Sequence, residues 1–172
     1  MNMARAWRWL LPVMAVLGLA SCSDRLPSQP AVRNLGVAPA GEIPLGSRLE
    51  ANRARWAASG IDVYRYRFRW ECFCVSDDVR VVDITVAGGT VMSVTDAETR
   101  EPLSAQAAAR YRTIDGLFDF VRESIDYPAE SIHADFDSNL GYPSMAYVDY
   151  VAGIADEELG FRVYALTPFQ RR

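Results

Sequence analysis

Lysine is absent from this sequence of 172 residues, histidine occurs once and cysteine three times. All 18 basic residues are therefore arginines, and 22 acidic residues outnumber them, which gives a formal charge of −4. This balance excludes a protein that binds nucleic acid through a clustered basic excess. One histidine and three cysteines also supply few groups for a metal centre or for acid–base catalysis. Half of the residues are apolar and 23% are charged, which is typical of one ordinary globular domain.

Residues 1–21 have the three parts of a secretory signal peptide. Arg5 and Arg8 form a positive segment, and an apolar segment follows over 10–19. The letters LASC, which end at Cys22, resemble the lipobox of bacterial lipoproteins. The resemblance implies cleavage before Cys22 and acylation of its thiol and its new amino group. Because the apolar segment is short for a membrane span, which needs about 20 residues, attachment would depend on the acyl chains.

The segment after the cysteine is predicted to be a tether. Ser23 stands where aspartate would favour the inner membrane, so under the sorting rule of Gram-negative cells we expect the outer membrane, facing the periplasm. Residues 23–46 carry four prolines and three glycines and have no apolar period. An N-terminal arm packed on the domain is the alternative. The predicted organisation is a signal peptide (1–21), a lipidated cysteine with its tether (22–46) and a single domain (47–172).

The domain begins with the pattern of a capped helix followed by a strand. Ser47 and Glu50 form a capping box, which predicts a helix over about 48–59 that Gly60 ends. From Ile61 the period changes to two, so that an aromatic face alternates with a row of guanidinium groups. The aromatic residues are Tyr64, Tyr66, Phe68 and Trp70, and the arginines are Arg65, Arg67 and Arg69.

The rest of the domain repeats this order. Gly88-Gly89 suits a tight hairpin between strands over about 80–87 and 90–95. After a polar, alanine-rich connection, Thr113 caps a second helix with one apolar face, which ends at 126–128. Three more strands are expected over 131–137, 144–151 and 161–166. The pattern predicts an α+β fold, α-βββ-α-βββ, in which one antiparallel sheet has both helices on one face; PepSY-like or cystatin-like units are the analogy.

Four short motifs resemble, in their order, a bacterial family of unknown function, the 6174 family. They are CFC at 72–74, TIDxLF at 113–118, FD followed by GYP between 136 and 143, and DEE at 156–158. The likeness covers about 61–166. Where prolines commonly follow the second cysteine in the family, this chain has the residues VSDD. The resemblance implies the fold and an envelope location, and it brings no activity, cofactor or catalytic residue.

Cys72 and Cys74 form the sharpest candidate site. On a regular strand the Cα atoms of residues i and i+2 lie about 7 Å apart, at the far limit of disulfide geometry. A bond between the two sulfurs therefore needs a bulge or a turn at Phe73. An oxidising compartment favours the disulfide, and two buried free thiols or a redox or metal site are the alternatives.

His133 has acidic neighbours but few further ligands for a metal. Strand alternation directs it to solvent beside Asp135 and Asp137, which favours a surface histidine. The segment 135–139 begins like a calcium loop, but Leu140 stands where such a loop needs glycine. A hairpin turn explains the same residues. We therefore predict no metal and no cofactor.

No residues stand out as catalytic. The sequence has no G-x-S-x-G elbow, and the acidic pairs Asp77/Asp78 and Glu157/Glu158 belong to polar turns, where solvation explains them.

The arginine row could act as an anion-binding face for a lipid headgroup, a polysaccharide or an acidic peptide. The alternative is pairing across strands with acids such as Glu71, Asp83 or Glu98.

Together these features favour a lipid-anchored, non-enzymatic domain of the cell envelope. It would be a monomer that presents its sheet face or hairpin loops to a protein or an envelope polymer. A thiol redox or metal-handling protein that uses Cys72 and Cys74 is the alternative. An inhibitor-like module directed against an envelope enzyme is a further one, by analogy of fold alone.

Overall fold

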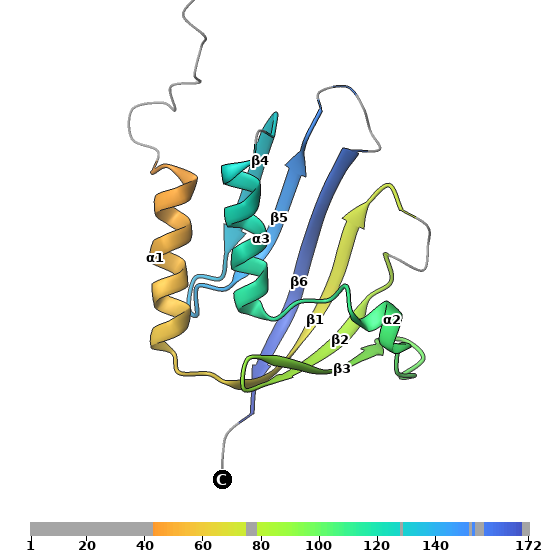
Figure 1. Ribbon diagram of the computed structural model, residues 1–172. Helices are drawn as coiled ribbons and strands as arrows, with labels where there is room; N and C mark the ends of the chain where they lie inside the picture. Colours follow the sequence, from red (N-terminus) through yellow and green to blue (C-terminus); the bar gives the residue numbers. More distant parts are fainter. Residues whose placement is uncertain (1–42, 75–78, 128, 152, 154–156, 170–172) are drawn as a thin grey trace, which may run out of the picture. The chain divides into compact units, whose positions relative to one another are not determined.

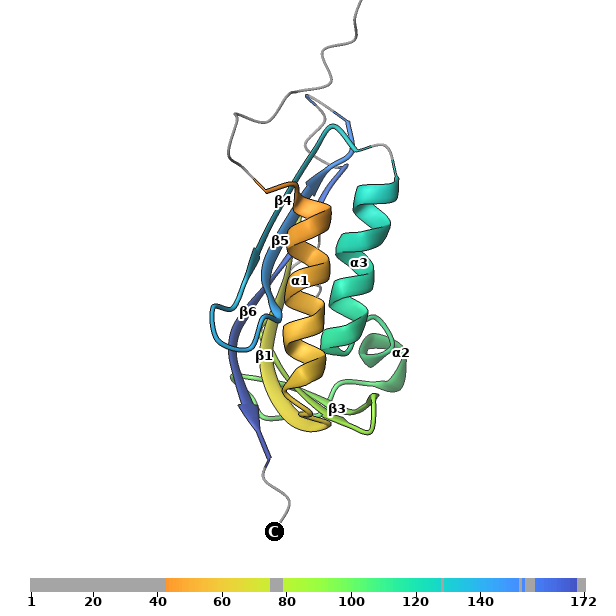
Figure 2. The ribbon, with the colours of Figure 1, turned by 90° about the vertical axis from the view of Figure 1, so that its left-hand side faces the viewer.

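Six antiparallel strands form one sheet, and the helices lie on one side of it (Figure 1). The structure, a computed structural model, describes residues 43–74, 79–127, 129–151, 153 and 157–169. In chain order the elements are α1 (Leu45–Ala58), β1 (Val63–Cys72), β2 (Val82–Ala87), β3 (Thr90–Asp96), α2 (Ala105–Ala108), α3 (Ile114–Asp126), β4 (Ser131–Phe136), β5 (Pro143–Asp149) and β6 (Glu158–Pro168). The predicted α+β fold is confirmed, and Figure 2 shows α1 and α3 on the same side of the sheet.

The sheet consists of two three-stranded meanders that meet in its centre. Its strand order is β3-β2-β1-β6-β5-β4, so the first strand of the first meander pairs with the last strand of the second. The turn between β2 and β3 is made by Gly88 and Gly89, whose φ angles are 55° and 72°. These left-handed conformations are open to glycine at no steric penalty, as the sequence predicted.

The core lies between the sheet and the two long helices. Alternate residues of β1 are buried and face the helices, as the period of two predicted. Leu49 and Trp56 contribute from α1, and the apolar face of α3 is buried along its length. Thr113 caps α3 as predicted, because its hydroxyl oxygen accepts the Gly116 N–H at 3.1 Å. Helix α1 packs against α3 and β4, and α3 packs against β4 and β5 (Figure 1).

The start of α1 differs from the prediction. The helix begins at Leu45, its N-cap is Pro44 (φ −52°, ψ 141°), and no side chain caps it. The predicted capping box of Ser47 and Glu50 is therefore wrong, and the expected boundary between tether and domain falls inside the helix. Glu50 instead pairs with Arg122 of α3, so its carboxylate joins two helices rather than closing a helix end.

Two further parts of the fold differ from the prediction, a short helix that was not expected and a last strand that is longer than expected. The alanine-rich connection contains the short helix α2, which Ser104 caps by accepting the Ala107 N–H at 3.3 Å. The last strand begins at Glu158, a residue expected in a turn, and runs to Pro168. Among the described helices, none is both long enough and apolar enough to span a membrane.

Candidate functional site

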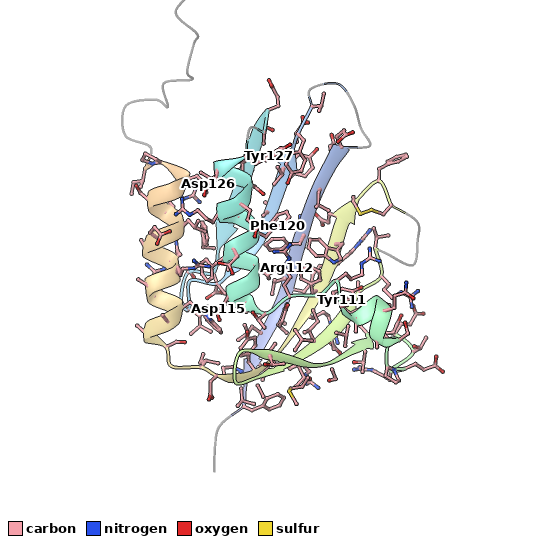
Figure 3. All side chains as sticks on the ribbon, in the orientation of Figure 1. Tyr111, Arg112, Asp115, Phe120, Asp126 and Tyr127 are labelled. Atoms are coloured by element: carbon pink, nitrogen blue, oxygen red, sulfur yellow. A yellow bond between two sulfur atoms is a disulfide. The ribbon has the colours of Figure 1, made fainter. Side chains whose placement is uncertain are left out.

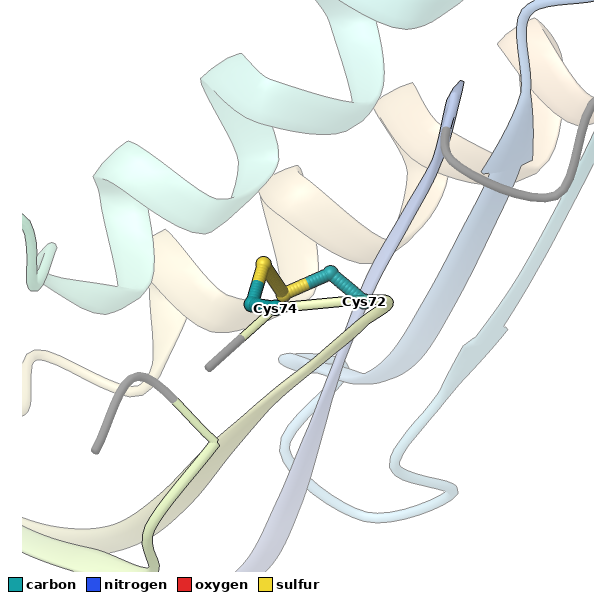
Figure 4. Close-up of a disulfide and its surroundings, with 2 residues drawn as sticks. All are labelled: Cys72 and Cys74. Atoms are coloured by element: carbon teal, nitrogen blue, oxygen red, sulfur yellow. A yellow bond between two sulfur atoms is a disulfide. The ribbon is translucent and has the colours of Figure 1, made fainter. Parts of the chain in front are cut away.

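The two cysteines at the end of β1 are joined in a disulfide (Figure 4). The strand ends at Cys72, the chain bends at Phe73, and the Cα atoms of Cys72 and Cys74 lie 5.2 Å apart. The bend brings the two Cα atoms closer than they would lie on a regular strand, within the range of a disulfide. It also leaves the Phe73 side chain 80% exposed. Of the three alternatives for this pair, the structure has the disulfide. The other predicted cysteine site, Cys22, lies outside the described residues.

The disulfide borders a hollow on the helix side of the sheet. This hollow, which we call the Trp70 hollow, has a volume of about 380 Å³. Its lining residues are Trp70, Cys72, Cys74, Ala109, Arg110, Arg112, Phe120 and Leu159. Its volume lies in the range of small-molecule sites.

A second hollow of about 410 Å³, the Tyr150 hollow, adjoins the first. The two share Arg112, Phe120 and Leu159, and the second is completed by Glu123, Ser124, Tyr127 and Tyr150. Because the two hollows adjoin through these shared residues, we call them together the groove beside α3. Aromatic rings continue along it, since Tyr127 and Tyr150 contact each other with their ring centroids 6.0 Å apart.

Phe120 forms the floor between the two hollows. Its ring lies 6.0 Å from that of Trp70 and 5.5 Å from that of Phe161, so it is fixed against both central strands. The Arg112 guanidinium carbon lies over the Phe120 ring, 5.7 Å from its centroid, in cation–π geometry. Figure 3 shows Phe120 and Arg112 next to each other on the side of α3 that faces β6 and β1.

Arg112 is positioned by the strand beneath it. The buried Tyr66 hydroxyl donates a hydrogen bond to the Arg112 carbonyl oxygen. Burial raises the pKa of Tyr66 well above its ordinary value, so the hydroxyl stays protonated and remains a donor. Nη1 of the guanidinium lies 3.4 Å from the Gly116 carbonyl oxygen and 3.6 Å from Oε2 of Glu123.

Trp70 carries a polar atom without a partner. Its side chain is 7% exposed, and its buried Nε1–H has no hydrogen-bond acceptor among the described residues. Tyr64, on the same face of β1, differs because its hydroxyl oxygen accepts the Ile114 N–H at 3.0 Å. An unpaired buried donor costs about 1–3 kcal/mol, so the end of β1 beside the hollow is not optimised for stability.

The three arginines of the row on the other face of the sheet differ in whether they have an acidic partner. Arg67 forms two hydrogen bonds with the Asp83 carboxylate, at 2.9 and 3.1 Å, and Arg100 approaches the same group at 3.2 Å. These contacts, with the Arg67 hydrogen bond foremost, lower the pKa of Asp83. For Arg67 the structure therefore shows the alternative to an anion-binding face, which is pairing with an acid on the neighbouring strand.

The other two arginines of the row lack such a partner among the described residues. Arg69 lies opposite Arg162 of β6, and Arg162 donates to Glu71 at 3.0 Å. The buried Nε of Arg69 has no hydrogen-bond acceptor in the described part of the chain. Arg65 is exposed and forms none of the ion pairs seen there, although its charge also helps to lower the pKa of Asp83.

His133 lies on the edge strand β4, 62% exposed, with Nε2 3.5 Å from the Asp135 carboxylate. The Asp137 carboxylate accepts the backbone N–H groups of Asn139 and Leu140, which is turn chemistry rather than calcium binding. Within the described ranges, no three His, Cys, Asp or Glu side chains gather as a metal site. The predicted acidic turn residues Asp77, Asp78 and Asp156 lie outside those ranges.

A family model, Family of unknown function (DUF6174), matches residues 48–168 of the chain. The chain belongs to this family. The match begins in α1 and ends at the last residue of β6, so membership covers all six strands and carries the fold that the motifs indicated. No curated protein and no solved structure matches the chain. The family description names no activity, so a function has to be argued from the groove.

Sequence reasoning placed Trp70 on the buried face of its strand and gave it no further role. It missed Phe120, Arg110, Arg112 and Leu159 as a site. One signal was present: Phe120 is a second aromatic residue beside the apolar stripe of α3. Arg110 and Arg112 come from the segment before α3 and Leu159 from the start of β6, and only the tertiary structure brings them together with Phe120.

Proposed function

We propose that this protein is a lipid-anchored binding module of the cell envelope that takes its ligand in the groove beside α3. The observation that carries the proposal is the Trp70 hollow, with an apolar and aromatic lining and a few positioned polar side chains. Concave, mainly apolar sites with few convergent polar groups are the usual form of ligand sites. The unpaired Trp70 N–H supports the proposal, because uncompensated polar groups gather at functional sites.

The lining of the Trp70 hollow favours binding over catalysis. Its side chains among the described residues include no carboxylate, no imidazole and no hydroxyl, and its two cysteines are joined. General acid–base or nucleophilic chemistry needs such a group within hydrogen-bond reach of the substrate. The composition of the Trp70 hollow therefore supports a site that holds a molecule.

The anchor is supported by the sequence around Cys22. The segment from Cys22 to the first described residue, Ile43, can span at most about 70 Å when extended. A domain on such a tether can face either the membrane or a soluble ligand. Cys22→Ser should abolish incorporation of a clickable fatty acid and release the protein from the membrane fraction. Retention of the label by this variant would contradict the anchor.

The binding role is tested by filling the hollow. The full chain is labelled with 5-fluorotryptophan, and Trp70→Phe assigns the ¹⁹F signal of Trp70. Small aromatic and aliphatic compounds that shift this signal should lose their effect in Ala109→Phe, because Ala109 lines the hollow. Ala105→Phe, at the first residue of α2 and outside the lining, is the control, since Ala109 caps the other end of that helix. Binding that is equal in both variants would overturn the proposal.

Thiol redox activity is the second candidate, because the disulfide borders the hollow and Cys74 is exposed. In such a reaction a dithiol partner would reduce the disulfide to two thiols and become a disulfide itself. Thiol trapping in intact cells tests it. A reduced fraction that changes with oxidant stress would support redox function, and a permanently oxidised pair would show that the bond is structural.

A further inference from the structure

Resting on the proposed binding role, we propose that the ligand is a small organic anion with an apolar body that ends in a carboxylate. The carboxylate lies in the Trp70 hollow against Arg112. The apolar body lies over Phe120 and Leu159 and extends into the Tyr150 hollow.

The charge of the lining carries the first step. The polar side chains of the Trp70 hollow are those of Trp70, Arg110 and Arg112, and each of them can only donate hydrogen bonds. A ligand that pairs with the Trp70 N–H and the Arg112 guanidinium has to bring acceptors, and the charge of Arg112 favours an acceptor with negative charge.

The charged residues of the Trp70 hollow differ from those of another hollow, which lies beside α2. That hollow, of about 410 Å³, contains Arg80, Asp96 and Glu101 together, and Arg80 already lies 3.6 Å from the Asp96 carboxylate. Its arginine and acidic side chains compensate one another. Arg110 lines both hollows, so Arg112 is the arginine that distinguishes the Trp70 hollow. The described side chains that line the Trp70 hollow include no acid.

Part of the Arg112 guanidinium has no acceptor among the described residues. Both of its contacts with protein oxygens use Nη1, one with the Gly116 carbonyl and one with Glu123. Nε and Nη2 therefore have no acceptor among the described residues. Because Tyr66 holds the backbone of Arg112 and Phe120 lies under its guanidinium, the group is oriented before a ligand arrives.

The position of Glu123 fixes the orientation of the ligand. Glu123 lines the Tyr150 hollow and is absent from the lining of the Trp70 hollow. A ligand carboxylate would be repelled in the Tyr150 hollow and attracted in the Trp70 hollow. The apolar end then meets Phe120, Leu159 and Tyr150.

A pair of isosteric probes tests the charge. The full chain, labelled as above, is titrated with 4-phenylbutyrate and with neutral 4-phenylbutyramide, and the shift of the Trp70 ¹⁹F signal reports binding. We expect the carboxylate to bind about ten-fold more tightly than the amide, which is the effect of one charged hydrogen-bonding interaction. Equal affinities would overturn the assignment of an anion and leave the binding role standing. No shift with either probe would overturn both.

Variants of the arginine and its neighbour test the geometry. Arg112→Gln should abolish the preference for the carboxylate, whereas Arg122→Gln should leave it intact. Arg122 is the matched control, because it lies on α3 and pairs with Glu50 of α1. Glu123→Gln should tighten binding of the carboxylate about two-fold, since it removes a competing partly exposed acid. An unchanged preference in Arg112→Gln would overturn the placement of the carboxylate.

Discussion

The two ends of strand β1 are built differently. At the N-terminal end, Tyr64, Tyr66 and Arg67 all have hydrogen-bond partners on neighbouring elements. At the C-terminal end, buried nitrogens of Arg69 and Trp70 have none among the described residues. The buried side-chain polar atoms of the strand are thus compensated at Tyr64 and Tyr66 and uncompensated at Arg69 and Trp70, while the more exposed Glu71 accepts a hydrogen bond from Arg162 at 3.0 Å. The difference fits a first end that stabilises the fold, and the unpaired Trp70 N–H supports the proposed ligand site in the Trp70 hollow; Arg69 lies on the opposite face of the sheet.

The largest expected effect comes from the compensated end. Tyr66→Ala should lower the free energy of unfolding by about 4 kcal/mol, because it removes a buried ring. It also removes the hydroxyl that holds Arg112. Urea denaturation measures the change, and Tyr164→Ala, at a residue that is 48% exposed, is the control with a small effect. A loss below about 2 kcal/mol would mean that Tyr66 does not support the sheet as described.

Next comes the carboxylate that holds Arg67. Asp83→Asn should cost about 2 kcal/mol at neutral pH, because it weakens hydrogen bonds to charged groups. Pairing lowers the pKa of Asp83 in the folded protein, so its contribution is present above the ordinary carboxyl pKa and is lost as the pH falls through the lowered value. Parent and variant should therefore converge in acid.

Glu71→Gln serves as the control for Asp83→Asn. Its pair with Arg162 is more exposed and should contribute under about 1 kcal/mol. A difference between parent and Asp83→Asn that stays constant as the pH falls would contradict the role of the charge.

A smaller effect is expected at Tyr64. Tyr64→Phe leaves the buried Ile114 N–H without its acceptor and should cost about 1 kcal/mol. Burial is the main reason that the pKa of Tyr64 is raised to about 12 from 10.0. The neutral hydroxyl therefore stabilises the fold fully below pH 10, and this contribution is lost as the pH rises toward the folded pKa. The variant should lose stability less steeply than the parent over that alkaline range, and an equal slope would contradict the assignment.

The smallest effect tests the uncompensated end. Arg69→Gln should change the free energy of unfolding by under about 0.5 kcal/mol, since Arg69 has no ion pair among the described residues. Arg67→Gln, one alternation earlier on the same strand, should cost clearly more. Thermal or urea unfolding of both variants measures the difference. Equal losses of unfolding free energy would contradict the difference between the two ends of β1.

Much of the fold could be predicted because its signals are local. The alternation along β1, the glycine pair of the first hairpin and the Thr113 cap each depend on a few neighbouring residues. The start of α1 could not be predicted in the same way. Ser47 and Glu50 have the local chemistry of a capping box, but Pro44 begins the helix earlier and Arg122 takes the Glu50 carboxylate. A contact between helices overrode a local preference.

The groove could not be predicted for the same reason. Trp70, Arg112, Phe120 and Leu159 come from the end of β1, the segment before α3, α3 itself and the start of β6. Each residue has an ordinary explanation in its own segment. Only the pairing of β1 with β6 and the position of α3 give the four side chains a shared surface.

The pairing of β1 with β6 also decides when this domain can fold. Glu71 and Arg162, which meet in the centre of the sheet, are 91 residues apart in the chain. Strand β6 is made after the other five strands, so the central seam cannot close until β6 has been synthesised. Until β6 is present, β1 has no partner on that side, and pairing between strands so far apart in the chain is slow to form. For a chain that carries the predicted signal peptide and crosses a membrane with its N-terminus leading, the β1–β6 seam forms only after β6 has also crossed.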